Sequence, residues 1–324
     1  MPWRARHPQE CRRSTLIELR SEDDIADYLD SSSNTLIGSV PKMRNSVLLF
    51  DENSRDNVLY CQEGVELVDS RIAFTSCDAL LFLRGPNCNL RLSLDLHGGT
   101  CFAFGASGYT NGALHVIVSE RTSVIIGDSA LISFGVWIRT ADPHLLYSAE
   151  TLQRVNPSKD ILIGDHVWLG QDCMLLKGTR IGSGSVVGAK ALVSGKAIPS
   201  NTVWGGNPAR QITAGVFFDG GGCVHNYDSE KTKASKSYAD KRWVYSSSCE
   251  VNDSGLSRLS NELRSARNAR EKAEMLDRAY DDEERNRFAF DAGLSSPERR
   301  STPMKLGSLG RWVTRKARAL GGRR

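Results

Sequence analysis

The chain has 324 residues, of which 40% are apolar and 25% are charged, and its formal net charge is only +4. This length exceeds that of a mini-protein, and no apolar run approaches the roughly 18 residues that a membrane span needs. The charged N-terminus is followed by TLIELRSEDDIADYLD instead of an apolar stretch, so we expect no secretory signal and a cytoplasmic protein. The eight cysteines form no CxxC pair, which predicts free thiols.

The first third of the chain contains short apolar segments with irregular spacing. Residues 1–35 include a stretch with helix-like periodicity, which we expect to form an N-terminal cap. Residues 36–122 contain the segments ALLFLRG, LRLSLDLHGG, CFAFGA and ALHVIVSE, separated by Gly, Asn and Asp. We interpret them as early, less regular coils of the repeat that follows.

An aliphatic residue recurs at every sixth position of the next segment. These residues are Ile163, Leu169, Leu175, Ile181, Val187 and Val193. Four residues after each lies a small or apolar residue: Val167, Cys173, Thr179, Ser185, Ala191 and Ala197. Glycines mostly follow the aliphatic position directly, at Gly164, Gly170, Gly182 and Gly188.

A period of six matches neither the 3.6 residues of a helix turn nor the alternation of a simple strand. Three hexads per turn make a triangular prism, in which the aliphatic residues stack inside, the small residues fit the corners, and glycine accepts unusual backbone angles. The sequence therefore predicts an all-β fold, a parallel β-helix of the hexapeptide-repeat type over residues 36–212. A glycine-rich β-sandwich or a chance run is the alternative.

The repeat is interrupted once. Its phase is already present at Ile126, Ile132 and Ile138, but the next aliphatic position, Ile163, lies 25 residues further on. We expect residues 143–161 to leave the prism as an excursion loop. Long loops inside a compact repeat array are uncommon unless they serve a function.

The C-terminal third loses the repeat. We expect residues 213–250 to fold back on the last coil and residues 251–324 to form a charged helix and a basic tail. Nine basic residues and no acidic one lie between Arg299 and the end, so the first 298 residues carry a net charge of −5. The tail would be amphipathic as a helix and could contact an anionic membrane surface, but a disordered solvated tail explains the charges equally well. Nucleic acid is not an expected partner.

Three stretches resemble a known family. IRTADPHLLY, NPSKDILIGDHVWLG and IGSGSVVGAKALVSGKAIPSNTVWGGNPAR are similar to the left-handed β-helix acyltransferases of the hexapeptide-repeat class. More closely, they resemble the branch that O-acetylates capsular and exopolysaccharides, including polysialic acid. The resemblance is specific over roughly residues 124–212, weaker over 36–122 and 213–245, and absent beyond 250. It implies a left-handed β-helix, acetyl-CoA as co-substrate and a homotrimer.

The resemblance also implies catalytic residues. His144 occupies the position of the family's catalytic histidine, and an imidazole is suited to remove a proton from a sugar hydroxyl near neutral pH; a histidine of an ordinary surface loop is the alternative. Asp142 could orient the His144 ring or simply cap the turn before Pro143. Trp168 occupies an outward position of its hexad and, by resemblance, helps to line the thioester pocket through its indole or its backbone N–H; an ordinary structural hexad position is the alternative.

The resemblance places acetyl-CoA beside the last coils. Backbone approach to the pantetheine arm is implied at Gly188 and Ala189, and polar or basic contacts at Ser194, Lys196 and Arg210, although the last two could be ordinary surface charges. The segment SGKAIP is one residue longer than the usual family form, which makes Lys196 the less certain match.

No metal site is expected. The six histidines, at 7, 97, 115, 144, 166 and 225, include no H-x4-H pair. We expect His166 to be a solvated or interface residue.

These features predict an acetyl-CoA-dependent O-acetyltransferase that acts on a capsular polysaccharide, an exopolysaccharide or a lipid-linked glycan. The cytoplasm, with the inner face of the cell membrane as an option through the basic tail, is the expected location. Two alternatives remain open at this point. One is acetylation of a small acceptor such as a free sugar, a nucleotide sugar or serine, and the other is a non-catalytic β-helix scaffold.

Overall fold

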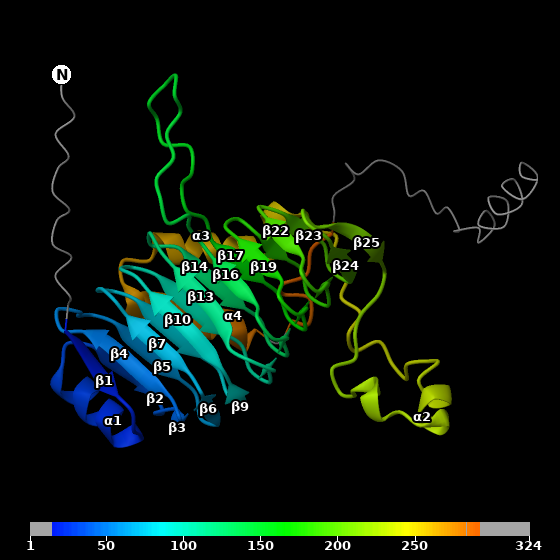
Figure 1. Cartoon of the computed structure of the whole chain (residues 1–324), viewed down its shortest axis with the longest axis horizontal. Coiled ribbons are helices and arrows are strands. Elements are labelled where there is room, and N and C mark those ends of the chain that lie inside the picture. The colour runs from blue at the N-terminus through cyan, green and yellow to red at the C-terminus, as the bar shows by residue number, and fades with distance from the viewer. Residues whose placement is uncertain (1–14, 283, 292–324) are drawn as a thin grey trace, which may run out of the picture. The chain divides into compact units, whose positions relative to one another are not determined.

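The computed structural model describes residues 15–282 and 284–291, which belong to one compact unit, Met1–Gly293. Most of its strands pair in parallel and wind into a solenoid of about seven turns (Figure 1). The repeat predicted this parallel β-helix, and the resemblance predicted its left hand. The basic tail, for which a membrane contact was weighed, lies outside the described residues.

The solenoid has three faces. Face 1 consists of β1 (Leu16–Leu19), β4 (Val47–Asp51), β7 (Arg71–Phe74), β10 (Leu92–Leu96), β13 (Leu114–Val118), β16 (Trp137–Arg139), β19 (Met174–Leu176) and β22 (Leu192–Ser194). Face 2 consists of β2 (Thr35–Gly38), β5 (Val58–Cys61), β8 (Leu80–Leu83), β11 (Cys101–Phe104), β14 (Ser123–Ile126), β17 (Ile161–Ile163), β20 (Arg180–Ile181) and β23 (Ala197–Ile198).

Face 3 is divided into two sheets. The first contains β3 (Lys42–Arg44), β6 (Val65–Val68) and β9 (Asn87–Leu90). The second contains β12 (Tyr109–Thr110), β15 (Leu131–Ile132), β18 (Trp168–Leu169), β21 (Val186–Val187), β24 (Thr202–Gly205) and β25 (Arg210–Ala214). Two antiparallel pairs, β1 with β4 and β24 with β25, flank the parallel ladders.

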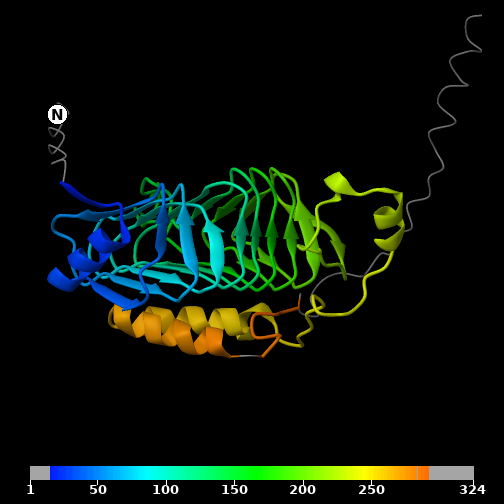
Figure 2. The same ribbon diagram turned by 90° about the horizontal axis from the view of Figure 1, so that it is seen from below.

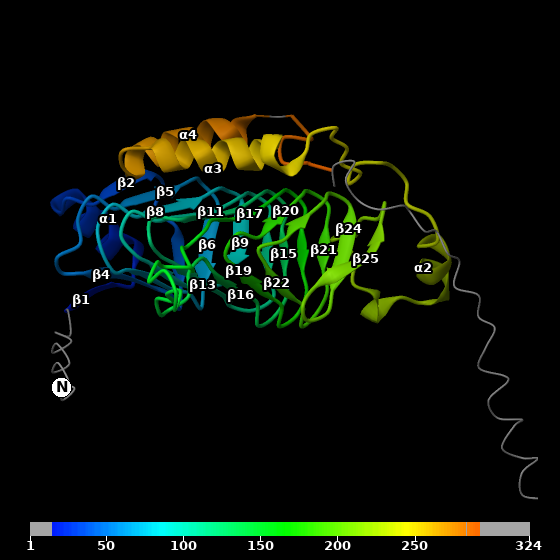
Figure 3. The same cartoon turned by 90° about the horizontal axis from the view of Figure 1, so that it is seen from above.

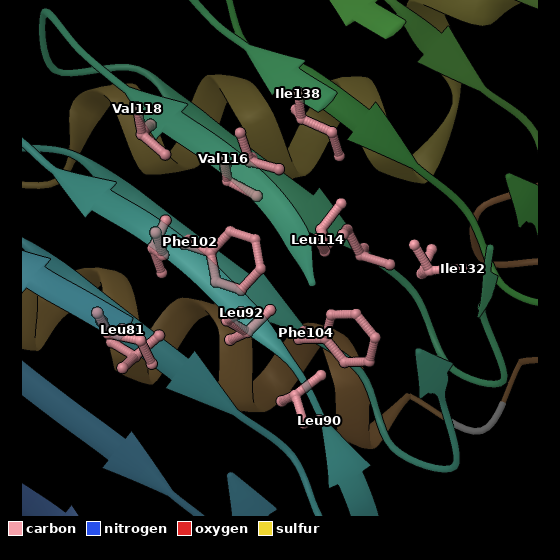
Figure 4. Packing of buried hydrophobic residues seen from close by; sticks show 14 of the residues in the cluster. Leu81, Leu90, Leu92, Phe102, Phe104, Leu114, Val116, Val118, Ile132 and Ile138 are labelled. Atoms are coloured by element: carbon pink, nitrogen blue, oxygen red, sulfur yellow. The ribbon is translucent and has the colours of Figure 1, made fainter. Parts of the chain in front are cut away.

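The predicted aliphatic ladder forms the core of the prism. All six repeat residues from Ile163 to Val193 are fully buried. The same inward stacking extends upstream, where Phe102 and Phe104 lie among leucine and valine side chains (Figure 4). Successive coils therefore cover one another's apolar side chains, and each coil depends on its neighbours for burial.

The repeat glycines are required for a different reason from the one expected. Gly164, Gly170 and Gly182 do not adopt positive φ angles, whereas His166 does (φ 51°). A Cβ on Gly164 would instead lie 2.7 Å from the backbone nitrogen of Ser183 in the next coil. Close approach of neighbouring coils, rather than an unusual backbone angle, excludes a side chain at these positions.

The six-residue spacing shortens by one residue in the last coil. Ile181 pairs with Ile198 instead of residue 199, and Ala197, expected at a crowded corner, is exposed. The preceding corner contains Gly195 at a φ of +60°, as the six-residue corner one coil earlier contains Gly178 at +80°.

Two helices cover face 2. α3 (Gly255–Ser265) and α4 (Ala269–Asp281) lie side by side along it (Figures 2 and 3). Ser254 caps α3 and Asn268 caps α4, so the single charged helix expected from the sequence is divided in two. Their apolar sides pack on outward residues of face 2, including Leu80, Phe82, Cys101, Ala103, Ile125 and Leu162.

The remaining helices are short. α1 (Glu22–Ser31) begins with a Ser21–Asp24 capping box and buries Ile25 and Leu29 against the first coils. α2 is Ser229–Ala234, and two single 3-10 turns, η1 and η2, span Val224–Asn226 and Val251–Asp253. No helix among the described residues is long and apolar enough to cross a membrane.

A buried ion cluster holds the segment after α4 against the prism. The Arg287 guanidinium donates to Asp128 at 2.6 Å and to Asp165 at 2.9 Å. Burial raises the pKa of the Asp165 carboxyl, an effect that the bonds from Arg287 oppose. Because both carboxylates follow a repeat glycine at the same prism corner, one arginine fastens the C-terminal segment to two coils.

Candidate active site

The excursion leaves the prism at the edge shared by faces 1 and 2. Its residues, 140–160, lie between the end of β16 and the start of β17 and project as a narrow arm (Figure 1). The expected limits, 143–161, differ slightly because residues 140–142 already follow β16 and Ile161 belongs to β17. Tyr147 and Arg154 form an antiparallel bridge between the two limbs of the arm.

Polar contacts fasten the base of the arm to the prism. The Asp142 carboxylate accepts hydrogen bonds from Lys177 Nζ at 2.5 Å and from Asn156 Nδ2 at 2.9 Å. These bonds, that of Lys177 first, lower the pKa of Asp142. Asn156 also donates to the backbone carbonyl of His144 at 2.8 Å. Asp142 therefore holds the backbone beside His144 through Asn156.

A second contact holds the returning limb. Arg154 donates two 2.8 Å hydrogen bonds to the Glu120 carboxylate, and Ser158 donates a third bond to it. The arginine bonds are the main cause that lowers the pKa of Glu120 to about 2. Glu120 lies at the end of the β13 coil, so the arm is fixed to the coils on both sides of its origin.

His144 is exposed on this anchored arm. Among the described residues its imidazole has no hydrogen-bond partner, and the Asp142 carboxylate accepts from Lys177 and Asn156 instead. The ring is thus free to meet a ligand, while its backbone is held in place.

Trp168 lies away from the arm. It projects from β18 on face 3, opposite the edge from which the arm rises, and is 37% exposed. Its Nε1 donates to Ser133 Oγ at 3.0 Å, and its ring contacts Phe218 at 5.8 Å between centroids. A single chain therefore does not bring Trp168 and His144 together.

His166 differs from expectation. It is buried, only 2% exposed, and stacks between Phe218 and Trp243 at centroid distances of 4.0 and 3.6 Å. Its Nε2 meets the Phe218 carbonyl at 2.9 Å, and burial lowers the pKa of the ring. His166 thus fixes the segment that follows the last coil and is not a solvated residue.

The five expected cofactor residues surround β22. Gly188 and Ala189 precede the strand, Ser194 ends it, and Lys196 follows at the edge shared by faces 1 and 2. Arg210 begins β25 beside it, because Ala209 N donates to the Leu192 carbonyl at 2.8 Å. Ser194 and Arg210 are exposed, and Lys196 is half-buried.

An apolar strip on face 1 connects β22 with the arm. Outward side chains form one row of Trp137, Met174 and Leu192, and Leu176 lies in the adjacent row. All four are partly or fully exposed. This strip was not predicted from the sequence, although its signal is apolar residues at outward strand positions. β16 and β22 are separated by one strand, a distance of about 10 Å.

Arg139 was also missed. It occupies the outward position that ends β16, next to the base of the arm, and its Nε is buried without a partner among the described residues. Its charge contributes to the lowered pKa of Asp142. A guanidinium on face 1 beside the arm is a candidate contact for substrate.

Three of the cysteines in the described residues are buried. The seven cysteines in this part of the chain are free thiols, as predicted. Burial raises the pKa values of Cys61, Cys101 and Cys173 to about 12, so these thiols stay protonated. No group of three or more His, Cys, Asp or Glu side chains suited to a metal ion occurs in residues 15–282 and 284–291.

Comparisons with known proteins agree with the six-residue repeat. A family model described as bacterial transferase hexapeptide (six repeats) matches residues 160–195. The polysialic acid O-acetyltransferase of Neisseria meningitidis is 30% identical over 146 residues, which are 45% of this chain and 67% of the relative. The galactoside O-acetyltransferase of Lactococcus lactis is 33% identical over 125 residues, 38% of this chain and 58% of the relative.

A solved structure is also similar. The polySia specific acetyltransferase NeuO superposes with a TM-score of 0.48 and 24% identity, covering 63% of this chain and 94% of that one. The fold, the repeat and the sequence matches define a class of protein: this chain belongs to the hexapeptide-repeat acetyltransferases. It spans about two thirds or less of the length of the two curated relatives described above.

Proposed function

We propose that the protein is an O-acetyltransferase that moves an acetyl group from acetyl-CoA to a hydroxyl of a cell-surface glycan. The observation that carries the proposal is an exposed histidine on an anchored arm, joined to the expected cofactor positions by an apolar strip. The Neisseria relative, named for polysialic acid, supports a polymeric glycan as acceptor.

The surface around β22 fits the chemistry of acetyl-CoA. Gly188 presents backbone without a side chain, the face 1 strip offers apolar contact to a pantetheine arm, and Lys196 and Arg210 offer cations to phosphate groups. When bound, acetyl-CoA would supply an activated acyl group as a thioester.

His144 would act as general base. Its imidazole removes the proton from the acceptor hydroxyl, and the oxygen attacks the thioester carbonyl. The new C–O bond forms, the C–S bond breaks, and the leaving thiolate takes up a proton. General-base catalysis of this kind contributes about 10²–10⁴-fold. Asp142 acts as a positioning residue through Asn156. The Trp168 indole would line the thioester pocket, since its Nε1 already donates to Ser133 and its backbone N–H to the Ser185 carbonyl.

We place each active site between two copies of the chain. His144 and Trp168 lie on opposite sides of one prism, so a second copy is needed to bring them together. The arm exposes apolar side chains that suit such a contact: Leu145, Leu146, Tyr147, Leu152 and Val155 are each more than half exposed. A threefold assembly satisfies this requirement at three equivalent sites.

The central test is release of CoA across oligosaccharide acceptors. His144→Ala should lower kcat at least 10²-fold without changing the circular-dichroism melt. His225→Ala, a change at another exposed histidine, should leave kcat unchanged. Equal activity in His144→Ala and His225→Ala would contradict the mechanism.

Mixing experiments test the shared site. His144→Ala and Trp168→Ala proteins should each be impaired, whereas a mixture refolded together should regain part of the activity, because some sites contain both native residues. A refolded mixture no more active than the average of its components would contradict a site formed by two copies.

A further inference from the structure

A cavity lies beside the base of the arm, between face 2 and α3. Its volume is about 700 Å³. The returning limb of the arm supplies Ser158 and Lys159, the prism supplies Arg180, and the helices supply Arg264 and Lys272. Its lining also includes Gly195 and Ala197, which flank Lys196, so the cavity begins beside the last of the expected cofactor residues.

The cavity is strongly cationic. Five Lys or Arg side chains and two carboxylates line it, so its net charge is +3. Both carboxylates are already paired: Glu120 accepts two bonds from Arg154, and Asp160 accepts a bond from Arg264 at 2.8 Å. The Asp160 carboxylate also accepts hydrogen bonds from Ser260 Oγ and Ser123 N, so both of its oxygens already have donors.

The other cations lack a carboxylate at close range. Lys159 is exposed and has no side-chain partner among the described residues. Arg180 donates to the neutral amide of Asn252 at 3.0 Å. Arg121 approaches Asp78 only at 3.9 Å.

Lys272 is the most deeply buried of the five cations that line the cavity. It is only 3% exposed, and its Nζ donates to the backbone carbonyl of Gly99. Burying an ammonium group is costly unless an anion or several acceptors compensate for the lost water. An anionic ligand in the cavity would provide that compensation.

We propose that this cavity binds an acidic residue of the acceptor glycan, so that the substrate class is an anionic polysaccharide. The inference rests on the proposed function, since it concerns the acceptor of that reaction. Lys159 follows the arm that carries His144 and also lines the cavity, so a polymer chain could reach from the cavity to the arm. A carboxylate matches the planar guanidinium of Arg180 in geometry.

Calorimetric titration of the full chain tests the proposal. The probes are a sialic acid hexamer, a galacturonic acid hexamer, neutral maltohexaose and CoA. The variants are Lys159→Gln with Arg180→Gln, and Lys233→Gln as a matched control on α2, outside the cavity. Melting curves confirm that each variant folds.

We expect at least one acidic hexamer to bind the wild type and maltohexaose not to bind. The Kd of that acidic hexamer should rise at least tenfold in the double variant and stay unchanged in Lys233→Gln, while the Kd of CoA stays unchanged in both. The proposal is overturned if neither acidic hexamer binds, or if the double variant and the control bind it equally. It is also overturned if the double variant weakens CoA alone, since the cations then serve the phosphates of the co-substrate.

These titrations are separate from the proposed reaction, because they require no acetyl transfer. His144→Ala should bind the acidic hexamer as the wild type does. Binding through the cavity without CoA release would contradict the reaction and support the site. Normal transfer with an unchanged Kd in the double variant would contradict the site alone.

Discussion

Lys177 on the coil after the arm donates to Asp142 at the base of the arm, across a distance of 2.5 Å. The same carboxylate holds Asn156, which in turn holds the backbone carbonyl of His144. One ion pair between a regular coil and an irregular loop therefore sets the position of the histidine.

Asp142→Asn and Lys177→Met should each reduce activity more than stability. Both side chains are at least partly exposed, and pairs of this kind contribute about 0–1 kcal/mol to folding. The arm would lose its fixed base, so we expect kcat to fall about 10-fold to 100-fold while KM for acetyl-CoA stays close to the wild-type value. Steady-state kinetics with a thermal melt check this. A drop in melting temperature that accounts for the lost activity would contradict it.

The anchor between Glu120 and Arg154 predicts a pH dependence. The pKa of Glu120 is about 2 in the folded chain, below the value of about 4.3 in an unfolded chain. Its contribution is therefore complete above the unfolded value and is lost as the pH falls towards 2. Pepsin cleavage within the arm should accelerate from pH 4 to pH 2. Glu120→Gln should already be cleaved faster at pH 4, and a wild-type rate for Glu120→Gln at pH 4 would contradict the assignment.

Arg287→Met should destabilise the fold by about 3–5 kcal/mol, because it leaves the buried Asp165 carboxylate without an ion-pair partner and Asp128 with Arg84 alone. Since burial raises the pKa of Asp165, protonating that carboxyl favours the folded state, and the benefit is lost as the pH rises through the folded pKa. The difference from the wild type should therefore be smaller at pH 4.5 than at pH 7.5 in urea unfolding. Arg267→Met, a change at an exposed position, is the control.

Gly164→Ala should destabilise the prism by about 1–3 kcal/mol, since the added methyl group would overlap the backbone of the next coil. Gly220→Ala is the matched control, because a Cβ there meets nothing closer than 3.5 Å. Thermal unfolding of both variants tests this, and the melting temperature of Gly164→Ala should be the lower of the two. Equal melting temperatures would show that neighbouring coils can separate without cost.

The prism was predictable because its inward residues repeat. Leu169 and Val187 occupy equivalent positions 18 residues apart and pair in adjacent coils. Three six-residue repeats in the sequence therefore correspond to one turn of the solenoid. The cover on face 2 was harder to foresee. Its signal was the segment Leu80–Leu83, in which all four side chains are apolar and buried. A strand without alternating polar residues is typical of a sheet that is covered on both faces.

The site was predictable only in part. His144 and the residues around β22 follow from the resemblance, because their positions are tied to the repeat. The bonds of Asn156 to Asp142 and to the His144 carbonyl depend on how 14 residues of irregular loop close on themselves, which no period describes. The cavity beside α3 depends on a helix about 100 residues away in sequence, since Ser260 meets Asp160 there.

The parallel strand pairing also fixes distances along the solenoid axis. Each coil adds one strand spacing, about 4.8 Å, between the arm at β16 and the terminal strand β22. The distance from the histidine-bearing loop to the end of the solenoid can therefore change only in whole coils. Insertion or deletion of one 18-residue coil between β16 and β22 would therefore change the length of the proposed cofactor path by one strand spacing.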